Sequence, residues 1–593
     1  MELERVIQNI TREGLEQLFN TKLSTDKINL QKTKKDFDGD VTVLTFPFTS
    51  FSKKSPEETG EMLGKYLLKH CEEVADFNTV KGFLNLTITD DYWVAFLSNI
   101  SKEDTYGHAD EASGKIIMVE YSQPNTNKPL HLGHLRNNML GFSLSNILKA
   151  NGHEIIMANI INDRGIHICK SMLAWQRWGN GETPESSGLK GDKLVGKYYV
   201  AFDKHYKEEI RGLVADGMDE EEAAKKAPLI IEAQEMLQQW EAGDAETREL
   251  WKKMNAWVLA GFDVTYENLG VTFDEVYYES DTYILGKDHV SEGLKNGTFY
   301  QKDDKSIWCD LSHDKMDPKL LLRADGTSVY ITQDIGTAIQ RFEDYNLDQQ
   351  IYVVGDEQIH HFKVLFSILK KMGYEWADSN FHLSYGMVEL PSGKMKSREG
   401  TIVDADDIMD EMVRTAKSLS QELGKLGELE EDEKEHLYSL IGLGALKYFL
   451  LKVDPKKKML FDPKESIDFA GNTGPFIQYT YTRIRSLLRK TETDQNLTFS
   501  DEYSLEDKER DVIRLLYEFP EVVKDAGTYL SPALVANYVY ELAKSFNNFY
   551  QSLPILKDVE PEVTAFRLNL SNETGKVIQS AMLLLGIELP DRM

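Results

Sequence analysis

The spacing of apolar residues over residues 1–114 predicts a small domain of helices and short strands. VTVLTFPFTS and GFLNLTITD alternate apolar and polar positions, as half-buried strands do. A helix predicted over Pro56–Cys71 has apolar residues at helical spacing, namely Met62, Leu63, Tyr66 and Leu67. The chain begins with MELERVIQNITREGLEQLF, whose pattern is that of an amphipathic helix. We recognise no catalytic cluster in this part of the chain.

A strand–helix–strand pattern begins near Lys115. KIIMVEYS is a continuous apolar run, typical of a buried parallel strand, and SQPNTNKP has the composition of a loop. The helix that follows carries Leu135, Met139, Phe142 and Ile147 on one face and ends at Asn151-Gly152, a left-handed cap. EIIMANIIND predicts a second buried strand. This βαβ unit is typical of the opening of a nucleotide-binding fold.

The remaining patterns divide the chain further. Residues from about 179 to 261 are helical and acidic, and we expect them to be inserted into the nucleotide-binding fold. Strand patterns return at TFYQ, SIWCDL, SVYIT and QIYVVG, whereas 406–593 has almost no strand signal and predicts a helical bundle. We therefore predict an α/β protein with an N-terminal α/β domain at 1–114, a Rossmann-type parallel-sheet domain at 115–405 and an all-helical domain at 406–593.

Composition narrows the class of protein. Hydrophobic residues make up 41% of the 593 residues and charged residues 28%, which is ordinary for a globular protein. We find no apolar run long enough to span a membrane and no signal peptide, and we expect a cytoplasmic protein. The three cysteines lie far apart without CxxC pairing, which indicates a reducing compartment and argues against a cysteine-built zinc site.

The distribution of charge leaves nucleic-acid binding open. A net charge of −30 disfavours broad binding to phosphate. Residues 441–490, however, hold ten bases and only four acids, so a local basic face could still bind a polyanion. The alternative interpretation is a solvated helix surface. The bases are Lys447, Lys452, Lys456, Lys457, Lys458, Lys464, Arg483, Arg485, Arg489 and Lys490.

The motif HLGH lies where the first helix of the βαβ unit begins. Backbone N–H groups and the helix dipole at that point attract phosphate. His131 and His134 can donate hydrogen bonds to phosphate oxygens, and Gly133 leaves room for an adenine ring. The motif therefore indicates binding of ATP phosphates and nucleotidyl transfer. A metal site is disfavoured because no third ligand is nearby, and incidental surface histidines are the other alternative.

A second basic motif, GKMKSREG at 393–400, follows more than 250 residues later. Its glycines and its three bases within five residues suit a loop that closes over a triphosphate and neutralises departing pyrophosphate. Alone it would mean little. Together with HLGH it predicts that Lys394 and Arg398 act on phosphate and that Met395, Lys396 and Ser397 contact ATP.

HLGH and KMKSR resemble the two signature motifs of class I aminoacyl-tRNA synthetases. The longer string SQPNTNKPLHLGHLRNNMLG resembles the arginyl-tRNA synthetases in particular. The resemblance covers essentially the whole chain, from GDVTVLTFPF in an N-terminal tRNA-binding domain to DFAGNTGPFIQYTYTRIRSLLRK and LLGIELPDRM in an anticodon-binding domain. It implies formation of arginyl-adenylate from arginine and ATP, followed by transfer to the 3′-terminal ribose of arginine tRNA.

One departure from the family pattern concerns the second signature. Serine and then lysine usually occupy its third and fourth places, whereas this chain has Lys396 and Ser397. The family often lacks that later lysine, and a lysine before the histidine motif is thought to replace it. Lys128, three residues before His131, occupies that position. We therefore expect Lys128 to be catalytic together with His131 and His134.

The resemblance also nominates residues that bind substrates. For arginine it nominates Glu120 and Asp334, with Tyr330 and Gln358 beside them. It also nominates Asn125 to hold the α-amino or carboxylate end of the arginine. Carboxylates suit this task because the guanidinium offers a planar fork of donors. A pocket matched to arginine should reject lysine without editing, and we see no editing-sized insertion. For tRNA it nominates Asn85, Lys456, Lys457, Lys458, Tyr479, Arg483 and Met593.

The resemblance further implies ATP with Mg²⁺, no protein-bound zinc, no membrane partner and a monomer. Two other functions stay open at this point. A smaller HxGH nucleotidylyltransferase would share only one domain with this chain and would not need the basic helical C-terminal domain. A non-catalytic tRNA-binding relative should have eroded signature motifs, and neither motif is eroded beyond Lys396.

Overall fold

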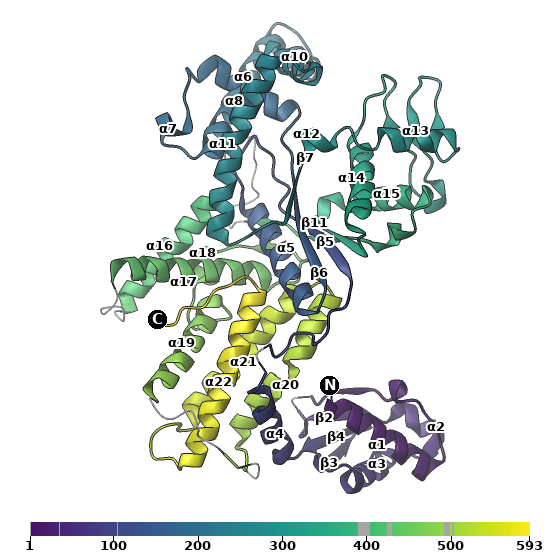
Figure 1. Cartoon of the computed structure of the whole chain (residues 1–593), viewed down its shortest axis with the longest axis vertical. Helices are drawn as coiled ribbons and strands as arrows, with labels where there is room; N and C mark the ends of the chain where they lie inside the picture. The colour runs from purple at the N-terminus through teal and green to yellow at the C-terminus, as the bar shows by residue number, and fades with distance from the viewer. Residues whose placement is uncertain are drawn as a thin grey trace.

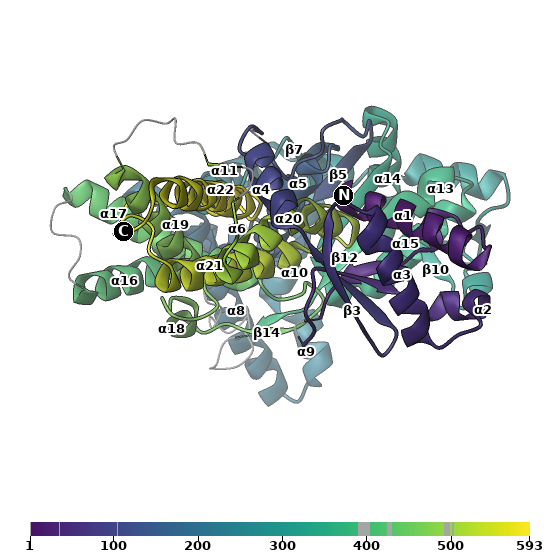
Figure 2. The ribbon, with the colours of Figure 1, turned by 90° about the horizontal axis from the view of Figure 1, so that it is seen from below.

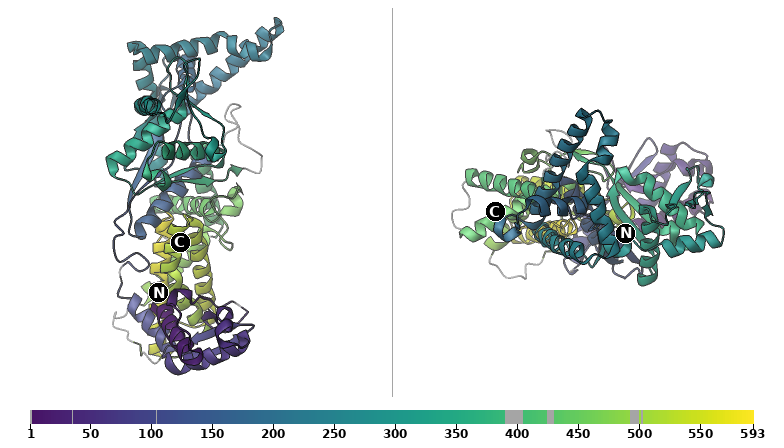
Figure 3. Two further views of the ribbon diagram at one scale, coloured as in Figure 1. Left: turned by 90° about the vertical axis from the view of Figure 1, so that its right-hand side faces the viewer. Right: turned by 90° about the horizontal axis from the view of Figure 1, so that it is seen from above.

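The computed structural model describes residues 2–34, 36–103, 105–389, 404–423, 430–491, 499–500 and 503–593, without the side chains of 422 and 423. The molecule is elongated, with a parallel sheet near its middle (Figure 1). Helices inserted into the sheet domain lie at one end of the long axis, and the N-terminal domain lies at the other (Figure 3). The C-terminal helices lie between the sheet and the N-terminal domain.

The N-terminal domain is an antiparallel sheet of order β1-β2-β4-β3, with helix α3 packed on β3 and α1 packed on α3. The two predicted helices and the strand predicted at GFLNLTITD are confirmed. The predicted strand VTVLTFPFTS is confirmed only over its first four residues, because Pro47 directs the chain into a tight helical turn at Phe46–Phe48. The elements are α1 (Glu2–Phe19), β1 (Leu30–Lys32), β2 (Val41–Leu44), α2 (Thr49–Ser52), α3 (Pro56–His70), β3 (Val74–Val80), β4 (Phe83–Ile88) and α4 (Asp90–Ile100).

This domain is docked on helix α20 (Asp507–Thr528) of the C-terminal bundle, and α4 lies beside α20 (Figure 2). Arg514 pairs with Asp40, whose carboxylate is almost fully buried and lies 474 positions away in the sequence. Arg510 pairs with Asp90 at 2.5 Å. Because the pairs are largely desolvated and each charge is hydrogen-bonded, they fix the orientation of the domain.

The central sheet has five parallel strands in the order β12-β11-β5-β6-β7. β5 is the middle strand, so the loop that leaves its carboxyl end lies in the crevice where such folds bind ligands. The predicted βαβ unit is confirmed, including the cap after α5, where Gly152 has φ +81°. The elements are β5 (Ile116–Glu120), α5 (Leu132–Ala150), β6 (Glu154–Ile161), α6 (Ile166–Trp178), β7 (Glu275–Tyr278), β11 (Gln349–Gly355), α15 (Ile359–Lys371), β12 (Asn380–Tyr385) and β13 (Val388–Glu389).

A helical insertion lies between β6 and β7, in the region where the sequence pattern is helical and acidic. It comprises α7 (Pro184–Ser187), α8 (Gly191–Ala215), α9 (Glu220–Lys226), α10 (Pro228–Ala242) and α11 (Ala245–Leu269). Helices α8 and α11 pack so closely that a Cβ on Gly191 would lie 1.9 Å from the carbonyl oxygen of Trp257. Glycine at position 191 is therefore required for this helix pair.

A second insertion follows β7. It holds a small antiparallel sheet of order β10-β9-β8, and α14 follows it. The strand predicted at SVYIT is wrong, because α14 begins at Tyr330. The β-branched residues there suggested a strand, but Ile331, Ile335 and Ile339 are buried at helical spacing, and this buried face decides the structure. The elements are α12 (Glu279–Thr282), α13 (Lys287–Lys295), β8 (Tyr300–Gln301), β9 (Ile307–Cys309), β10 (Lys319–Leu322) and α14 (Tyr330–Tyr345).

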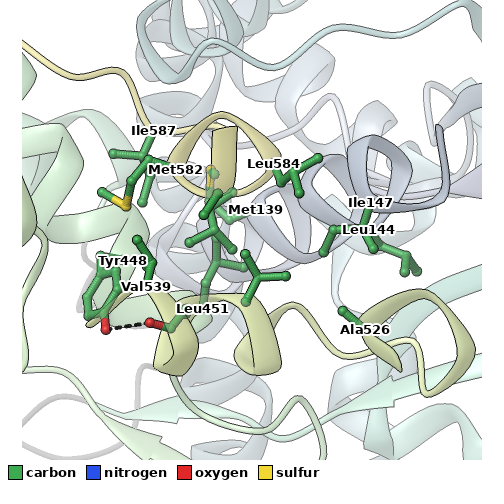
Figure 4. Close-up of a cluster of buried hydrophobic side chains, with 14 of the residues drawn as sticks. Met139, Leu144, Ile147, Tyr448, Leu451, Ala526, Val539, Met582, Leu584 and Ile587 are labelled. Atoms are coloured by element: carbon green, nitrogen blue, oxygen red, sulfur yellow. Dashed lines mark hydrogen bonds between the residues drawn. The ribbon is translucent and has the colours of Figure 1, made fainter. Parts of the chain in front are cut away.

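The C-terminal part is a helical bundle, as predicted, and α5 of the sheet domain packs into it. Met139, Leu144 and Ile147 of α5 meet apolar side chains of the bundle such as Val539 and Met582 (Figure 4). This shared core joins the sheet domain to the bundle. The elements are α16 (Ala405–Leu423), α17 (Glu431–Leu451), β14 (Met459–Leu460), α18 (Pro463–Ser466), α19 (Gly474–Lys490), α20, α21 (Pro532–Ser552) and α22 (Pro561–Leu584).

Candidate active site

The two histidines of HLGH cap the N-terminus of α5. His131 is the N-cap residue, and its Nδ1 accepts a hydrogen bond from the backbone N–H of Gly133 at 3.1 Å. Nδ1 of His134 accepts a hydrogen bond from the backbone N–H of His131, also at 3.1 Å. The two rings lie 4.0 Å apart between centroids. This reciprocal arrangement has the logic of a capping box and holds both rings at the start of the helix.

The structure gives Gly133 a role that the sequence did not indicate. A Cβ at position 133 would lie 2.9 Å from Cε1 of His131. The absence of a side chain therefore lets the His131 ring fold back over the first helical turn. Space for an adenine ring stays a prediction.

Burial sets the protonation state of the histidines. It lowers the pKa of His131 to about 3, and the charge of Lys128 acts in the same direction. Burial, His131 and Lys128 hold the pKa of His134 well below its usual range. Because both Nδ1 atoms accept backbone N–H groups, we assign the ring proton of each neutral imidazole to Nε2. The site therefore offers two neutral N–H donors at a helix N-terminus.

The loop between β5 and α5 has an unusual backbone. Ser122 and Gln123 have φ of +81° and +48°, a region that non-glycine residues seldom adopt. The side chains of two asparagines hold it there: Oδ1 of Asn137 accepts from the Ser122 N–H at 2.6 Å, and Oδ1 of Asn159 accepts from the Gln123 N–H at 3.1 Å. Asn125 forms an isolated bridge with the residue after β6. Such imposed strain is found where a loop must hold functional groups.

Lys128 lies on this loop, and burial lowers its pKa. The charge of Lys128 contributes to the lowered pKa of both histidines, after the larger effect of burial. Lys128, His131 and His134 lie in one segment, the loop after β5 and the start of α5, and their action on phosphate stays a prediction. The other predicted phosphate-binding residues lie outside the described part of the chain: Lys394, Met395, Lys396, Ser397 and Arg398.

Glu120 is the last residue of β5, at the carboxyl edge of the sheet, and its partner Arg341 lies on α14, the helix that also carries Asp334. The pKa of the buried phenol of Tyr352 is raised by burial, and the carboxylates of both residues raise it further. Each carboxylate already has a partner. Glu120 is buried against the guanidinium of Arg341, and Oδ2 of Asp334 lies 2.6 Å from Nε2 of His361. Neither partner was anticipated from the sequence.

The side chains of Tyr330 and Gln358, also nominated for arginine binding, are exposed. Tyr330 begins α14 one turn before Asp334 and is 71% exposed. Gln358 is also exposed, in the short 3₁₀ turn Asp356–Gln358 that follows β11. Both side chains therefore lie on the surface, one at the start of α14 and the other directly after β11.

Sequence reasoning missed a third acid of this cluster, Glu279. This residue is only 7% exposed, and its pKa is raised to about 7 by burial and by the negative charges of Asp334 and Asp163, against the lowering effect of Arg164. Glu279 follows β7 directly, as Asp163 follows β6 closely. The signal available in the sequence was an acid at the carboxyl end of a strand, within VYYES.

The guanidinium of Arg164 is held in place by two aromatic rings and an acid of the helical insertion. Its guanidinium lies 3.9 Å from the ring centroid of Tyr283 and 5.4 Å from that of Trp240, and it pairs with Glu241 of α10 at 2.6 Å. Stacking and ion pairing together hold a guanidinium firmly. Arg164 therefore connects the helical insertion to the end of β6.

The residues nominated for tRNA binding do not form one patch. Lys456, Lys457 and Lys458 are exposed in the turn before β14. Arg483 stacks over the Tyr479 ring at 5.0 Å on α19, and Met593 is half-buried against the core. The side chain of Asn85 is fully buried and hydrogen-bonded to Thr42 and Asn78, so it links strands of the N-terminal sheet, and its contact with tRNA stays a prediction.

The basic face predicted for residues 441–490 is also smaller than expected. Lys447 is buried and donates to the carbonyl of Gly586 at 2.9 Å, and burial lowers its pKa to about 8. Lys452 likewise donates to the carbonyl of Asn472 at 2.9 Å. These two lysines stabilise the bundle, and the exposed bases are mainly those of the 456–458 turn and the end of α19.

Comparisons with known proteins identify this architecture. Residues 96–462 match the family model described as tRNA synthetases class I (R), catalytic domain. The chain belongs to the arginyl-tRNA synthetase family. Residues 477–593 match the DALR anticodon binding domain. The arginine–tRNA ligases of Parabacteroides distasonis and Bacteroides fragilis are 54% and 55% identical to this chain, each over 100% of both sequences.

Solved structures agree with the fold of an arginyl-tRNA synthetase. The Thermus thermophilus arginyl-tRNA synthetase has a TM-score of 0.79 at 24% identity, with 100% of both chains covered. The Plasmodium falciparum arginyl-tRNA synthetase has a TM-score of 0.76 at 20% identity, covering 100% of this chain and 99% of that one. At these identities the likeness concerns the fold alone. No helix within the described residues is long and apolar enough to cross a membrane.

Proposed function

We propose that this chain attaches L-arginine to its tRNA in two steps, consuming ATP. The observation that carries the proposal is that two groups of side chains lie at the carboxyl edge of one sheet. One site is the pair of neutral histidine donors at the start of α5, and the other is the carboxylate cluster of Glu120, Asp334 and Glu279. Full-length similarity to arginine–tRNA ligases supports the same assignment.

In the first step a carboxylate oxygen of arginine attacks the α-phosphorus of ATP, the bond to the bridging oxygen breaks, and pyrophosphate leaves. Nε2–H of His131 and of His134 donates to phosphate oxygens whose charge grows in the transition state. The helix N-terminus favours the same charge, and Lys128 supplies a cation. We propose that Lys394, Arg398 and their neighbours in the second signature add further positive charge. Magnesium enters with ATP as part of the substrate.

In the second step a hydroxyl of the 3′-terminal ribose attacks the acyl carbon of arginyl-adenylate, and AMP leaves. No protein nucleophile is needed, so catalysis is positioning and electrostatic stabilisation. The proton of the attacking hydroxyl can pass to the departing phosphate oxygen. The histidines can assist this step as well, because as neutral N–H donors they bind the phosphate without adding positive charge to it.

The carboxylate cluster accounts for selectivity. A guanidinium bound there would meet Asp334 and Glu279, with Glu120 held in place by Arg341. We propose that the substrate also contacts Tyr330, Gln358 and Asn125. A lysine side chain carries one ammonium and cannot satisfy several acceptors arranged for a planar fork.

The anticodon-binding domain binds the tRNA, and we propose that the 456–458 lysines, Tyr479, Arg483 and Met593 contribute. The lysine turn is tied to α5 by Arg136, which is buried and donates to the carbonyls of Gly386 and Pro455 at 2.6 and 3.2 Å. The enzyme is proposed to act as a monomer in the cytoplasm. The three cysteines are all buried and form no disulfide, which suits a reducing compartment.

The test is an aminoacylation assay with total tRNA and each of the twenty amino acids, run beside ATP–pyrophosphate exchange. We expect arginine alone to be attached. Exchange with a different small acid and no charging of tRNA would instead support a nucleotidylyltransferase. Binding of tRNA without either activity would support a non-catalytic relative.

A further inference from the structure

Residues at the start of α8 in the helical insertion contact two segments that adjoin the histidine turn, residues 130–134. On one side, Lys190 and Lys193 face the segment Asp404–Asp407, which follows the second signature. On the other side, Gly196 lies against Pro129, so closely that a Cβ would be 2.8 Å from its Cδ and 3.6 Å from Cα of Lys128. No part of α8 carries a signature motif. Its position nevertheless brings it to the two segments that flank His131.

The ammonium of Lys190 contacts three polar side chains. It donates to Oγ1 of Thr265 at 2.6 Å, lies 3.2 Å from Oδ2 of Asp192, and pairs with Asp406. Thr265 in turn donates to the other carboxylate oxygen of Asp406 at 2.9 Å. The side chain of Asp192 is 0% exposed and that of Lys190 is 19% exposed. Because these charges are shielded from water, their geometry is strongly specified.

Lys193 makes a second connection one turn further along α8. It donates to Oδ1 of Asp407 at 2.9 Å and lies 3.4 Å from Oδ2 of Asp404. Asp404 also accepts the backbone N–H of Asp406 at 2.9 Å through its side chain. The two lysines thus hold three acids of one short segment, Asp404, Asp406 and Asp407, from one end of α8.

That segment contacts the histidine turn directly. The backbone N–H of Ala405 donates to the carbonyl of Leu130 at 2.9 Å, and Asp404 forms an antiparallel bridge with His131. Ala405 is fully buried, so the contact is part of the core. A shift of the 404–407 segment would therefore be passed to the backbone of His131, whose φ of −135° is outside the helix that it caps.

We propose that Lys190, Lys193 and Gly196 are positioning residues for adenylate formation. The lysines hold the 404–407 segment in contact with Leu130 and His131. Gly196 allows α8 to pack against Pro129, next to Lys128. The helical insertion is then a support of the catalytic turn and more than a peripheral addition. This inference rests on the proposed role of the histidine turn in activating arginine.

The lysine test compares Lys190→Met and Lys193→Met with Lys197→Met in the full-length enzyme. Lys197 lies on the same helix and pairs at 2.7 Å with Glu182, away from the 404–407 segment. We expect kcat for ATP–pyrophosphate exchange to fall about tenfold to a hundredfold in the first two variants, as misplacement of a catalytic group does, with KM for arginine little changed. Lys197→Met should match wild type, and Lys193→Arg should keep most of the wild-type rate, because it retains the cation.

The glycine test uses a matched pair on α8. Gly196→Ala introduces a methyl group against Pro129, whereas Gly212→Ala adds one where no atom lies within 4 Å. We expect Gly196→Ala to lower kcat for exchange about tenfold and Gly212→Ala to leave it unchanged, although both raise helix propensity. Melting temperatures of all variants separate positioning from unfolding, since a loss that follows the unfolded fraction would reflect stability alone.

The outcomes are distinguishable. A wild-type enzyme without arginine-dependent exchange would overturn the proposed function itself. An active wild type whose Lys190→Met, Lys193→Met and Gly196→Ala variants all keep its kcat, or lose activity only as they unfold, would overturn this inference and leave the proposed function intact. A rise in KM for arginine at constant kcat would also contradict it, because α8 would then act on the arginine pocket.

Discussion

Arginine binding should release a proton from Glu279. This carboxyl is nearly buried, and its pKa is raised to about 7 by burial and by its negative neighbours Asp334 and Asp163. Near neutral pH a large part of the free enzyme therefore holds a proton there. A guanidinium placed among these acids favours the charged carboxylate and must lower the pKa again.

The size of the effect follows from the two protonation states. If the bound cation lowers the pKa of Glu279 from about 7 to about 5, binding releases about 0.5 proton at pH 7 and about 0.8 proton at pH 6. The same linkage makes arginine bind about fivefold more tightly at pH 7 than at pH 6, and less than about twofold more tightly again at pH 8. The affinity therefore rises with pH and then levels off.

Isothermal titration calorimetry of arginine in buffers with different ionisation enthalpies measures this release. The slope of apparent binding enthalpy against buffer enthalpy gives the number of protons. Glu279→Gln keeps the shape and the hydrogen-bonding capacity of the side chain but cannot titrate, so its slope should be near zero between pH 6 and pH 7. His361→Gln is the control, because it removes the partner of Asp334 and leaves Glu279 in place, and it should keep the wild-type slope.

Two results would contradict this prediction. One is a wild-type slope of zero across pH 6–7, which would mean that Glu279 does not change protonation on binding. The other is proton release that persists unchanged in Glu279→Gln, which would assign it to another group. For the unliganded protein the sign is also fixed: because the folded pKa is raised, the stabilising contribution of protonated Glu279 is present below about pH 4.5 and is lost as the pH rises through 7.

Three further predictions concern the two sites. His131→Ala and His134→Ala should each slow adenylate formation about 10²–10³-fold with little change in arginine affinity, and unchanged single-turnover rates in both would contradict the phosphate role. Asp334→Asn should weaken arginine binding about 10-fold to 100-fold and leave ATP binding unchanged by calorimetry; its side chain is 33% exposed, so we expect the lower end of that range. Lys128→Ala should abolish most pyrophosphate exchange measured with tRNA present, and adding Ser397→Lys should restore part of it, whereas a fully active Lys128→Ala would show that another cation suffices.

The sequence predicted well where local patterns and burial agree. The βαβ unit around HLGH was predictable because the apolar run, the loop composition and the left-handed cap all indicate the same elements. At SVYIT the local residue types and the burial pattern disagree. The residue types favour a strand, but the buried isoleucines of α14 have helical spacing, and a helix forms. At Asn85 only the tertiary structure shows that the amide is buried between strands and bonded to Thr42 and Asn78.

The class of chemistry could be inferred from the linear chain, because HLGH after a buried strand and the string KMKSR are local sequence motifs. Which other groups act beside them depends on how the chain folds. Arg341 pairs with Glu120 across 221 positions of the chain, and Glu279 and His361 join the same cluster from separate elements. No local pattern carries this information, because the crossover connections of a parallel sheet bring distant strand ends together at one edge.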